Sequence, residues 1–123
     1  MMIKNFKMVQ ILNAFSENEA LRKKKLPVGL VYPMYKNLES LERAGTTYTK
    51  SLQYIEEAFK DSDEKELEIT KLINAESNVK IEAVPRSVIT ELDETKYDAL
   101  SFDDIKILDF MISDKTDEND LEE

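Results

Sequence analysis

Residues 26–59 read LPVGLVYPMYKNLESLERAGTTYTKSLQYIEEAF and predict one long amphipathic helix. Their apolar side chains recur three or four positions apart, which places them on one side of a helix with 3.6 residues per turn. The charged side chains lie off this stripe, as a solvent-exposed face requires. A helix of this length spans about 50 Å at about 1.5 Å per residue, so other segments must pack along it. The predicted buried stripe comprises Val31, Met34, Tyr35, Leu38, Leu41, Tyr48, Leu52, Ile55 and Phe59.

Two residues in this stretch oppose a regular helix. Pro33 lacks an amide hydrogen and clashes with the carbonyl four residues earlier, so either the regular helix begins near Tyr32 or its first turns are kinked. Pro27 fits a first turn better. Gly45, one of two glycines in the chain, disfavours a helix and predicts a bend or, as the alternative, a break into two helices.

The composition narrows the possible chemistry. A length of 123 residues fits one domain with a modest core, and 35% charged residues predict a broad polar surface. The absence of cysteine excludes disulfides, thiolate nucleophiles and zinc–thiolate sites, and the absence of histidine removes the commonest general base and transition-metal ligand. Gly29 and Gly45 are isolated, so no glycine-rich phosphate loop is predicted. We expect no catalytic residue, cofactor or metal site; the enzymatic alternative is a hard cation held by Asp98, Asp103 and Asp104.

The net charge of −9 is unevenly distributed. Residues 1–60 hold ten Lys or Arg against six acids, whereas residues 61–123 hold seven against twenty. An acidic half repels nucleic acid and favours either simple solubility or a surface complementary to a basic partner, such as a nucleic-acid-binding protein. No apolar run reaches the roughly 18 residues of a membrane span, and the amino terminus lacks the apolar core of a signal peptide, so a cytoplasmic location is expected.

The segment before the long helix predicts a strand and a helix. Residues 1–6 alternate loosely as a short strand would, and residues 7–21 carry a helical apolar face, with Ser16 or Asn18 ending that helix or capping the next turn. The basic run at residues 22–25 is favoured at the carboxyl end of a helix by the helix dipole. The alternative interpretation is contact with a phosphate or an acidic partner.

The segment after the long helix predicts a second helix and a strand. The polar turn at residues 60–65 is short, so a helix over residues 67–75 is expected to run antiparallel to the long one. Residues 78–84 alternate between apolar and charged side chains and predict a strand that pairs with the amino-terminal segment. Pro85 is expected to end this strand and begin a short helix over residues 86–92.

The last segment predicts one more helix and a tail. Ser101 and Asp104 have the spacing of a capping box, and Asp103 and Asp104 suit the positive end of the helix dipole. The predicted buried face of this last helix comprises Phe102, Ile105, Leu108, Met111 and Ile112. Residues 113–123 have one aliphatic residue and six acids, which predicts a disordered tail. The expected fold is therefore α+β and mainly helical over one domain, residues 1–112, with a long helix, an antiparallel companion helix, shorter flanking helices and a small two-stranded sheet.

A set of structural spacings supports a resemblance. In chain order these are MMIKNFKMVQILNAF at residues 1–15, Leu26 and Pro27 before the long helix, Lys36 and Asn37 within it, Pro85 behind the strand, and LDFMI at residues 108–112. In these features the chain resembles small uncharacterised proteins of tailed phages and prophages of Gram-positive bacteria, over most of residues 1–112. The resemblance implies a virus-encoded protein that works in the host bacterial cytoplasm or is associated with the virion, and it transfers no catalytic residue. Pro33 and Gly45 depart from the pattern.

Tyrosines and acids supply the candidate protein-binding residues. Tyr is common at protein interfaces because its ring is apolar while its hydroxyl is hydrated. The tyrosines of the long helix, including Tyr54, either cover the edge of the core or contact another chain or a second copy where the helix projects. The candidate residues are Tyr32, Tyr35, Tyr48, Glu91, Asp93, Glu94, Asp98, Asp103 and Asp104.

Three functions are compatible with these features. The first is a non-enzymatic, phage-encoded protein that inhibits a host or anti-phage defence protein by covering a basic, nucleic-acid-facing surface with its acidic half. The alternative is a virion structural or assembly factor that self-associates through the long helix. The third, a metal-dependent enzyme acting through carboxylates, requires specific binding of magnesium, manganese or calcium. No direct binding to nucleic acid or to a membrane is predicted.

Overall fold

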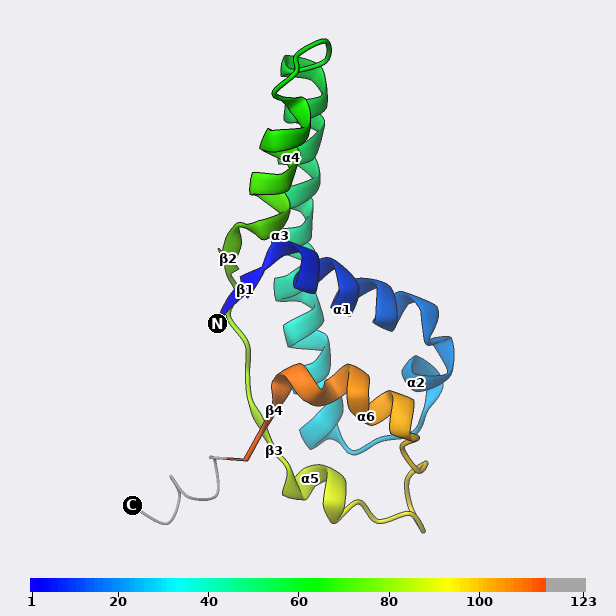
Figure 1. The fold of residues 1–123 in the computed structure, drawn as a ribbon. Coiled ribbons are helices and arrows are strands. Elements are labelled where there is room, and N and C mark those ends of the chain that lie inside the picture. The colour runs from blue at the N-terminus through cyan, green and yellow to red at the C-terminus, as the bar shows by residue number, and fades with distance from the viewer. Residues whose placement is uncertain (115–123) are drawn as a thin grey trace, which may run out of the picture.

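The computed structural model describes residues 1–114 and confirms the predicted fold class, mainly helical α+β (Figure 1). Of the predicted tail, residues 113–123, only Ser113 and Asp114 lie within the described residues, and Ser113 belongs to a strand. The elements in chain order are β1 (Met2–Lys4), α1 (Asn5–Glu17), α2 (Glu19–Lys23), α3 (Val28–Ala58), α4 (Lys65–Asn74), β2 (Glu76–Asn78), β3 (Val84–Pro85), α5 (Ser87–Thr90), α6 (Phe102–Leu108), the 3-10 helix η1 (Asp109–Met111) and β4 (Ile112–Ser113).

The predicted long helix is α3, which is continuous over 31 residues. Pro33 lies inside it, so of the two alternatives for Pro33 the one in which the regular helix begins near Tyr32 is wrong. The carbonyl that Pro33 cannot bond belongs to Gly29, which is exposed, so water can satisfy it. The helix also continues through Gly45, so the alternative of two separate helices is wrong.

Helix α1 packs across α3 and supplies much of the core (Figure 1). Gly45 lies at this contact, where an added Cβ would be 3.1 Å from Leu12 Cδ1, so its missing side chain lets the two helices approach closely. The ring of Phe15 meets that of Phe110 edge to face, with centroids 6.2 Å apart. The buried apolar cluster comprises Ile3, Met8, Ile11, Phe15, Leu21, Leu30, Met34, Leu41, Val79, Val84, Leu108 and Met111.

Helix α4 runs antiparallel to the carboxyl-terminal half of α3, as predicted, and the two form a hairpin that projects beyond the rest of the molecule (Figure 1). The turn at its tip is held in part by Ser62 Oγ, which accepts a hydrogen bond from the amide of Glu64. Helix α4 is only partly covered: none of its residues is buried, and Leu67 is 55% exposed. The hairpin therefore has water on most sides.

The predicted pairing of the amino-terminal strand is confirmed, but the partner strand lies earlier in the chain. β1 pairs antiparallel with β2, with Ile3 opposite Ser77. The predicted strand at residues 78–84 is therefore wrong for residues 79–83, because Asn78 ends β2 and Val84 begins β3. There the backbone amide and carbonyl of Glu82 are bonded by the side chain of Asn37 on α3, at 2.7 and 2.9 Å, rather than by a strand.

The carboxyl-terminal segments agree with the expected cap of the last helix but differ from expectation elsewhere. Pro85 does not begin a helix but lies in β3, which pairs parallel with β4, a pairing that was not predicted. The short helix is α5, four residues long. The capping box of Ser101 and Asp104 at the start of α6 is confirmed. Phe102, however, is 75% exposed and not part of a buried face, because α6 turns Asp104 and Leu108 towards the core instead.

Candidate protein-binding surface

The first two turns of α3 expose an apolar face. Val28, Tyr32 and Tyr35 lie four and three residues apart, so they share one side of the helix, and they are 78, 60 and 50% exposed. The prediction that Tyr35 belongs to the buried stripe is wrong. Met34 occupies the core side of this turn and is 2% exposed. An exposed apolar row of this kind is typical of a contact surface.

Tyr32 is held within a small charged network. Lys36 Nζ lies 5.2 Å from the centroid of the Tyr32 ring and 2.7 Å from Glu82 Oε2. The hydrogen bond and charge of Glu82, together with the nearby Tyr32, raise the pKa of Lys36. Since Glu82 is anchored through its backbone to Asn37, the network fixes Lys36 beside the tyrosine ring. Sequence reasoning missed Lys36 and Glu82, although Lys36 follows Tyr32 by one helical turn.

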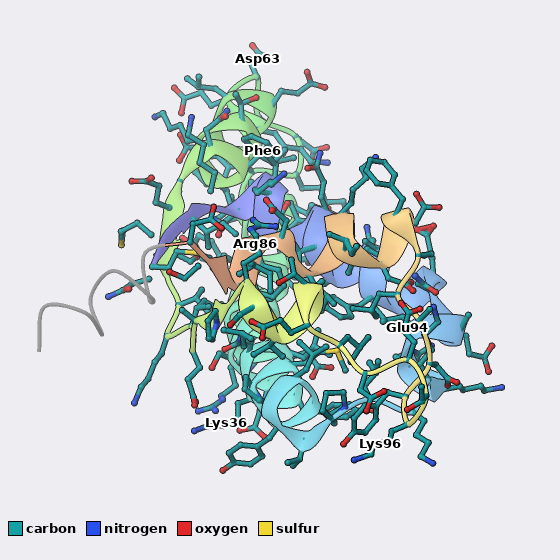
Figure 2. All side chains as sticks on the ribbon, turned by 90° about the horizontal axis from the view of Figure 1, so that it is seen from below. Phe6, Lys36, Asp63, Arg86, Glu94 and Lys96 are labelled. Carbon is teal, nitrogen blue, oxygen red and sulfur yellow. The ribbon has the colours of Figure 1, made fainter. Side chains whose placement is uncertain are left out.

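Acidic side chains border the same end of the molecule. The loop between α5 and α6 carries Glu91, Asp93, Glu94 and Asp98, all of them exposed. Glu91 and Asp93 line a hollow of about 340 Å³ together with Pro27, the residue that precedes α3. In Figure 2 this end faces the viewer: α5, the first turns of α3 and the loop with Glu94 are in front, and Lys36 lies at the rim.

The acidic loop is fixed in place by its own polar groups. Asp93 Oδ1 accepts hydrogen bonds from the amide and hydroxyl of Thr95 at 3.0 and 2.6 Å, and these bonds lower the pKa of Asp93. Asp98 exchanges two hydrogen bonds with the backbone of Lys25, one through its carboxylate at 2.7 Å and one through its amide at 2.8 Å. The loop is therefore bonded to the segment that leads into α3. These bonds fix the position of the loop acids relative to the exposed tyrosines of α3.

Asp104 is not part of this surface. It is 2% exposed, and its carboxylate accepts hydrogen bonds from Lys24 Nζ, Asn18 Nδ2 and the amide of Ser101 at 2.5, 2.8 and 2.9 Å. Burial of Asp104 raises its pKa, but these hydrogen bonds outweigh burial and hold the pKa below its usual value. The structure therefore assigns Asp104 a role in holding the fold, in agreement with its position in the capping box.

Tyr48 and Asp103 lie apart from the exposed tyrosines. Tyr48 follows Tyr35 by 13 residues, which turns it to a different side of α3. There it is half-buried and lines an open groove of about 690 Å³ between α1 and α3. Asp103 is exposed beside the carboxyl end of α1, where it lines a separate hollow with Ala14 and Glu17. Neither residue adjoins the surface at the start of α3.

The basic run at residues 22–25 is largely engaged within the chain. Arg22 and Lys23 occupy the last turn of α2, which confirms their predicted place at a helix carboxyl end. Lys24 Nζ bonds Asp104 and also donates to the carbonyl of Ala99 at 2.7 Å. Lys24 is therefore not available for the alternative role of the basic run, contact with a phosphate or an acidic partner.

The exposed tyrosines and the loop acids at this end of the molecule are together called the α3-start surface. It comprises Val28, Tyr32, Tyr35, Glu91, Asp93, Glu94 and Asp98. Within residues 1–114, no group of three or more acidic side chains is placed to hold a metal ion. None of the helices in that range is long and apolar enough to cross a membrane.

The fold and this surface define a mainly helical α+β protein with an exposed aromatic and acidic end. No protein-family model, curated protein sequence or solved structure matches the chain.

Proposed function

We propose that this chain is a non-enzymatic protein-binding protein that docks its α3-start surface on a basic surface of another protein. The observation that supports this most is the placement of two exposed tyrosines, Tyr32 and Tyr35, at the end of the molecule that carries the acidic loop. Aromatic anchors supply contact area in protein interfaces, and acids beside them favour a basic partner.

The charges of this surface are available to a partner. Within the described residues, Glu91, Asp93 and Glu94 form no ion pair. Lys36 is paired with Glu82, so the four acids of the surface outnumber the two exposed lysines without an ion pair beside them, Lys25 and Lys96. The hydrogen bonds of Asp93 and Asp98 hold the loop in one conformation, which reduces the entropy that binding must cost. The surface is therefore ordered before a partner arrives.

The resemblance to phage proteins suggests the partner's origin. A phage protein without catalytic side chains acts by occupying a surface of a host protein, and a basic surface in a bacterial cell commonly contacts nucleic acid. The proposed partner is a host or anti-phage defence protein with such a surface, and the proposed effect is inhibition.

Matched charge variants test this function. The immobilised chain is incubated with lysate of a Gram-positive host at about 0.1 M and about 1 M salt, where the Debye length falls from about 10 Å to about 3 Å. We expect basic proteins to be captured at low salt, to be lost at high salt, and to be lost with the double variant Glu91→Lys and Glu94→Lys. The variant Glu17→Lys with Glu42→Lys makes the same change of charge at exposed positions elsewhere and should retain them. Equal capture by both variants would contradict the proposal.

A further inference from the structure

The projecting hairpin carries exposed apolar side chains at the opposite end from the α3-start surface (Figure 1). On α3 the ring of Tyr54 is 67% exposed, and on α4 Leu67 is 55% exposed. Ile55, next to Tyr54, is 9% exposed, so this turn of α3 buries Ile55 and leaves the ring of Tyr54 outside. Tyr54 therefore offers an aromatic ring with a polar tip for contact outside the hairpin.

Along one face of α3 within the hairpin, a cation, an aromatic ring and an anion follow each other, so the face is complementary to a second copy of itself running in the opposite direction. Lys50, Tyr54 and Glu57 lie four and three residues apart and so share this face, and all three are exposed. Within residues 1–114, neither Lys50 nor Glu57 takes part in an ion pair. The face is also hollowed: a depression of about 450 Å³ is lined by Thr47, Lys50, Ser51, Tyr54 and Ile55.

We propose that two copies of this chain pair through this face, with their α3 helices antiparallel and the two-fold axis beside Tyr54. Lys50 lies four residues before Tyr54 and Glu57 three residues after it, so antiparallel pairing brings Lys50 of one copy level with Glu57 of the other, within about 1.5 Å along the helix axis. The symmetry forms this ion pair twice. The two Tyr54 rings then meet beside the axis, between the two ion pairs and at the end of the hollow that each ring helps to line.

The order of charges favours a second copy over an unrelated partner. A two-fold interface uses the same patch on both chains, so every group must meet its complement in that patch. The sequence of cation, aromatic ring and anion along one helix face meets this condition, whereas a uniformly acidic face does not. The face covers few turns of helix, so the dimer belongs to the small, transient class and forms at high protein concentration.

Sedimentation equilibrium with charge reversals tests the pairing. We expect the mass of the wild-type chain to rise from 14.3 kDa towards twice that value as concentration increases to about 1 mM. Lys50→Glu or Glu57→Lys alone should weaken the dimer at least about tenfold, and the double variant should restore it because the ion pairs are re-formed with exchanged sign. Glu56→Lys, on a different side of α3, makes the same charge change as Glu57→Lys and should leave the dimer intact.

Single-cysteine variants give a second readout, because the chain has no cysteine of its own. Tyr54→Cys places identical thiols beside the proposed axis, where a disulfide requires Cα atoms within about 7 Å. Under mild oxidation it should form covalent dimers much faster than Thr49→Cys, which lies on the groove side of α3. A wild-type chain that stays monomeric to about 1 mM, a double charge variant that does not regain the dimer, or equal cross-linking of both cysteine variants would each overturn the pairing.

Discussion

Lys24 and Asp104 form an ion pair across eighty residues of the chain, with Nζ 2.5 Å from Oδ2. Lys24 follows the last residue of α2, and Asp104 lies in the first turn of α6. Their side chains are 21% and 3% exposed, so the pair is shielded from water. Asn18, which caps α2, also bonds Asp104, so one buried carboxylate joins the end of α1, the start of α2 and the start of α6.

Loss of the lysine should destabilise the fold. Lys24→Met leaves the buried Asp104 charge without its cation, and we expect the free energy of unfolding to fall by about 2 kcal/mol, less than for a fully buried pair because Lys24 is partly hydrated. Lys23→Met is the matched control, since it breaks only the exposed pair with Glu19 and should cost less than about 0.5 kcal/mol. Urea denaturation measures both. Equal losses in the free energy of unfolding for the two variants would contradict a larger contribution of the Lys24–Asp104 pair to stability.

The low pKa of Asp104 predicts a specific dependence of stability on pH. The unfolded carboxyl binds its proton at a higher pH than the folded one, so the stabilisation is complete above the unfolded pKa of about 3.9 and declines as the pH falls through the folded pKa. Asp104→Asn cannot titrate and lacks this decline. Urea midpoints between about pH 7 and about pH 3 should therefore fall more steeply for the wild type than for the variant. Parallel curves would contradict the assignment.

Asn37 should be among the most sensitive positions of α3. It is 1% exposed, and its amide group satisfies both the N–H and the C=O of Glu82. Asn37→Leu leaves both backbone groups without a partner, so we expect a loss of about 3 kcal/mol in the free energy of unfolding. Glu82→Gln keeps the backbone bonds and weakens only the exposed pair with Lys36, so it should lower stability far less than Asn37→Leu.

The two glycines of α3 should respond differently to alanine. At Gly29 an added Cβ meets nothing within 4 Å, so Gly29→Ala should stabilise the protein by about 0.5–1 kcal/mol through helix propensity. At Gly45 the Cβ would lie 3.1 Å from Leu12 Cδ1. Leu12 borders an open groove and can shift, so Gly45→Ala should gain about half as much. Gly45→Leu should destabilise by about 2 kcal/mol through overpacking. A larger gain at Gly45 than at Gly29 would contradict the close approach of α1 and α3.

Local patterns in the sequence predicted most helices of this fold, because apolar spacing and caps are local signals. The capping-box spacing of Ser101 and Asp104 predicted the start of α6, and the apolar stripe predicted α3. The errors arise where the partner is distant. Alternation after Asn78 suggested a strand, but the bonding partner is the side chain of Asn37, 45 residues away from Glu82. No local pattern shows that a polar Asn will be buried.

The candidate surface was only partly predictable for a related reason. Tyr32 and Tyr35 were singled out by residue type, and the exposed loop acids by charge. Tyr48 was grouped with them, although the 3.6-residue repeat already turns it to another side of α3. The capping-box spacing from Ser101 distinguishes Asp104 from its exposed neighbour Asp103, but only the folded chain brings Lys24 and Asn18 to the Asp104 carboxylate.

Site-specific photo-cross-linking tests the proposed binding surface most directly. A photoreactive residue replaces Tyr32 in one chain and Thr46 in another; both positions are exposed on α3, and Thr46 lies outside the α3-start surface. After irradiation in Gram-positive host cells, we expect an adduct with a basic host protein from position 32 and none from position 46. The adduct should disappear when Glu91→Lys and Glu94→Lys are also present. No adduct from position 32, or the same adducts from both positions, would contradict it.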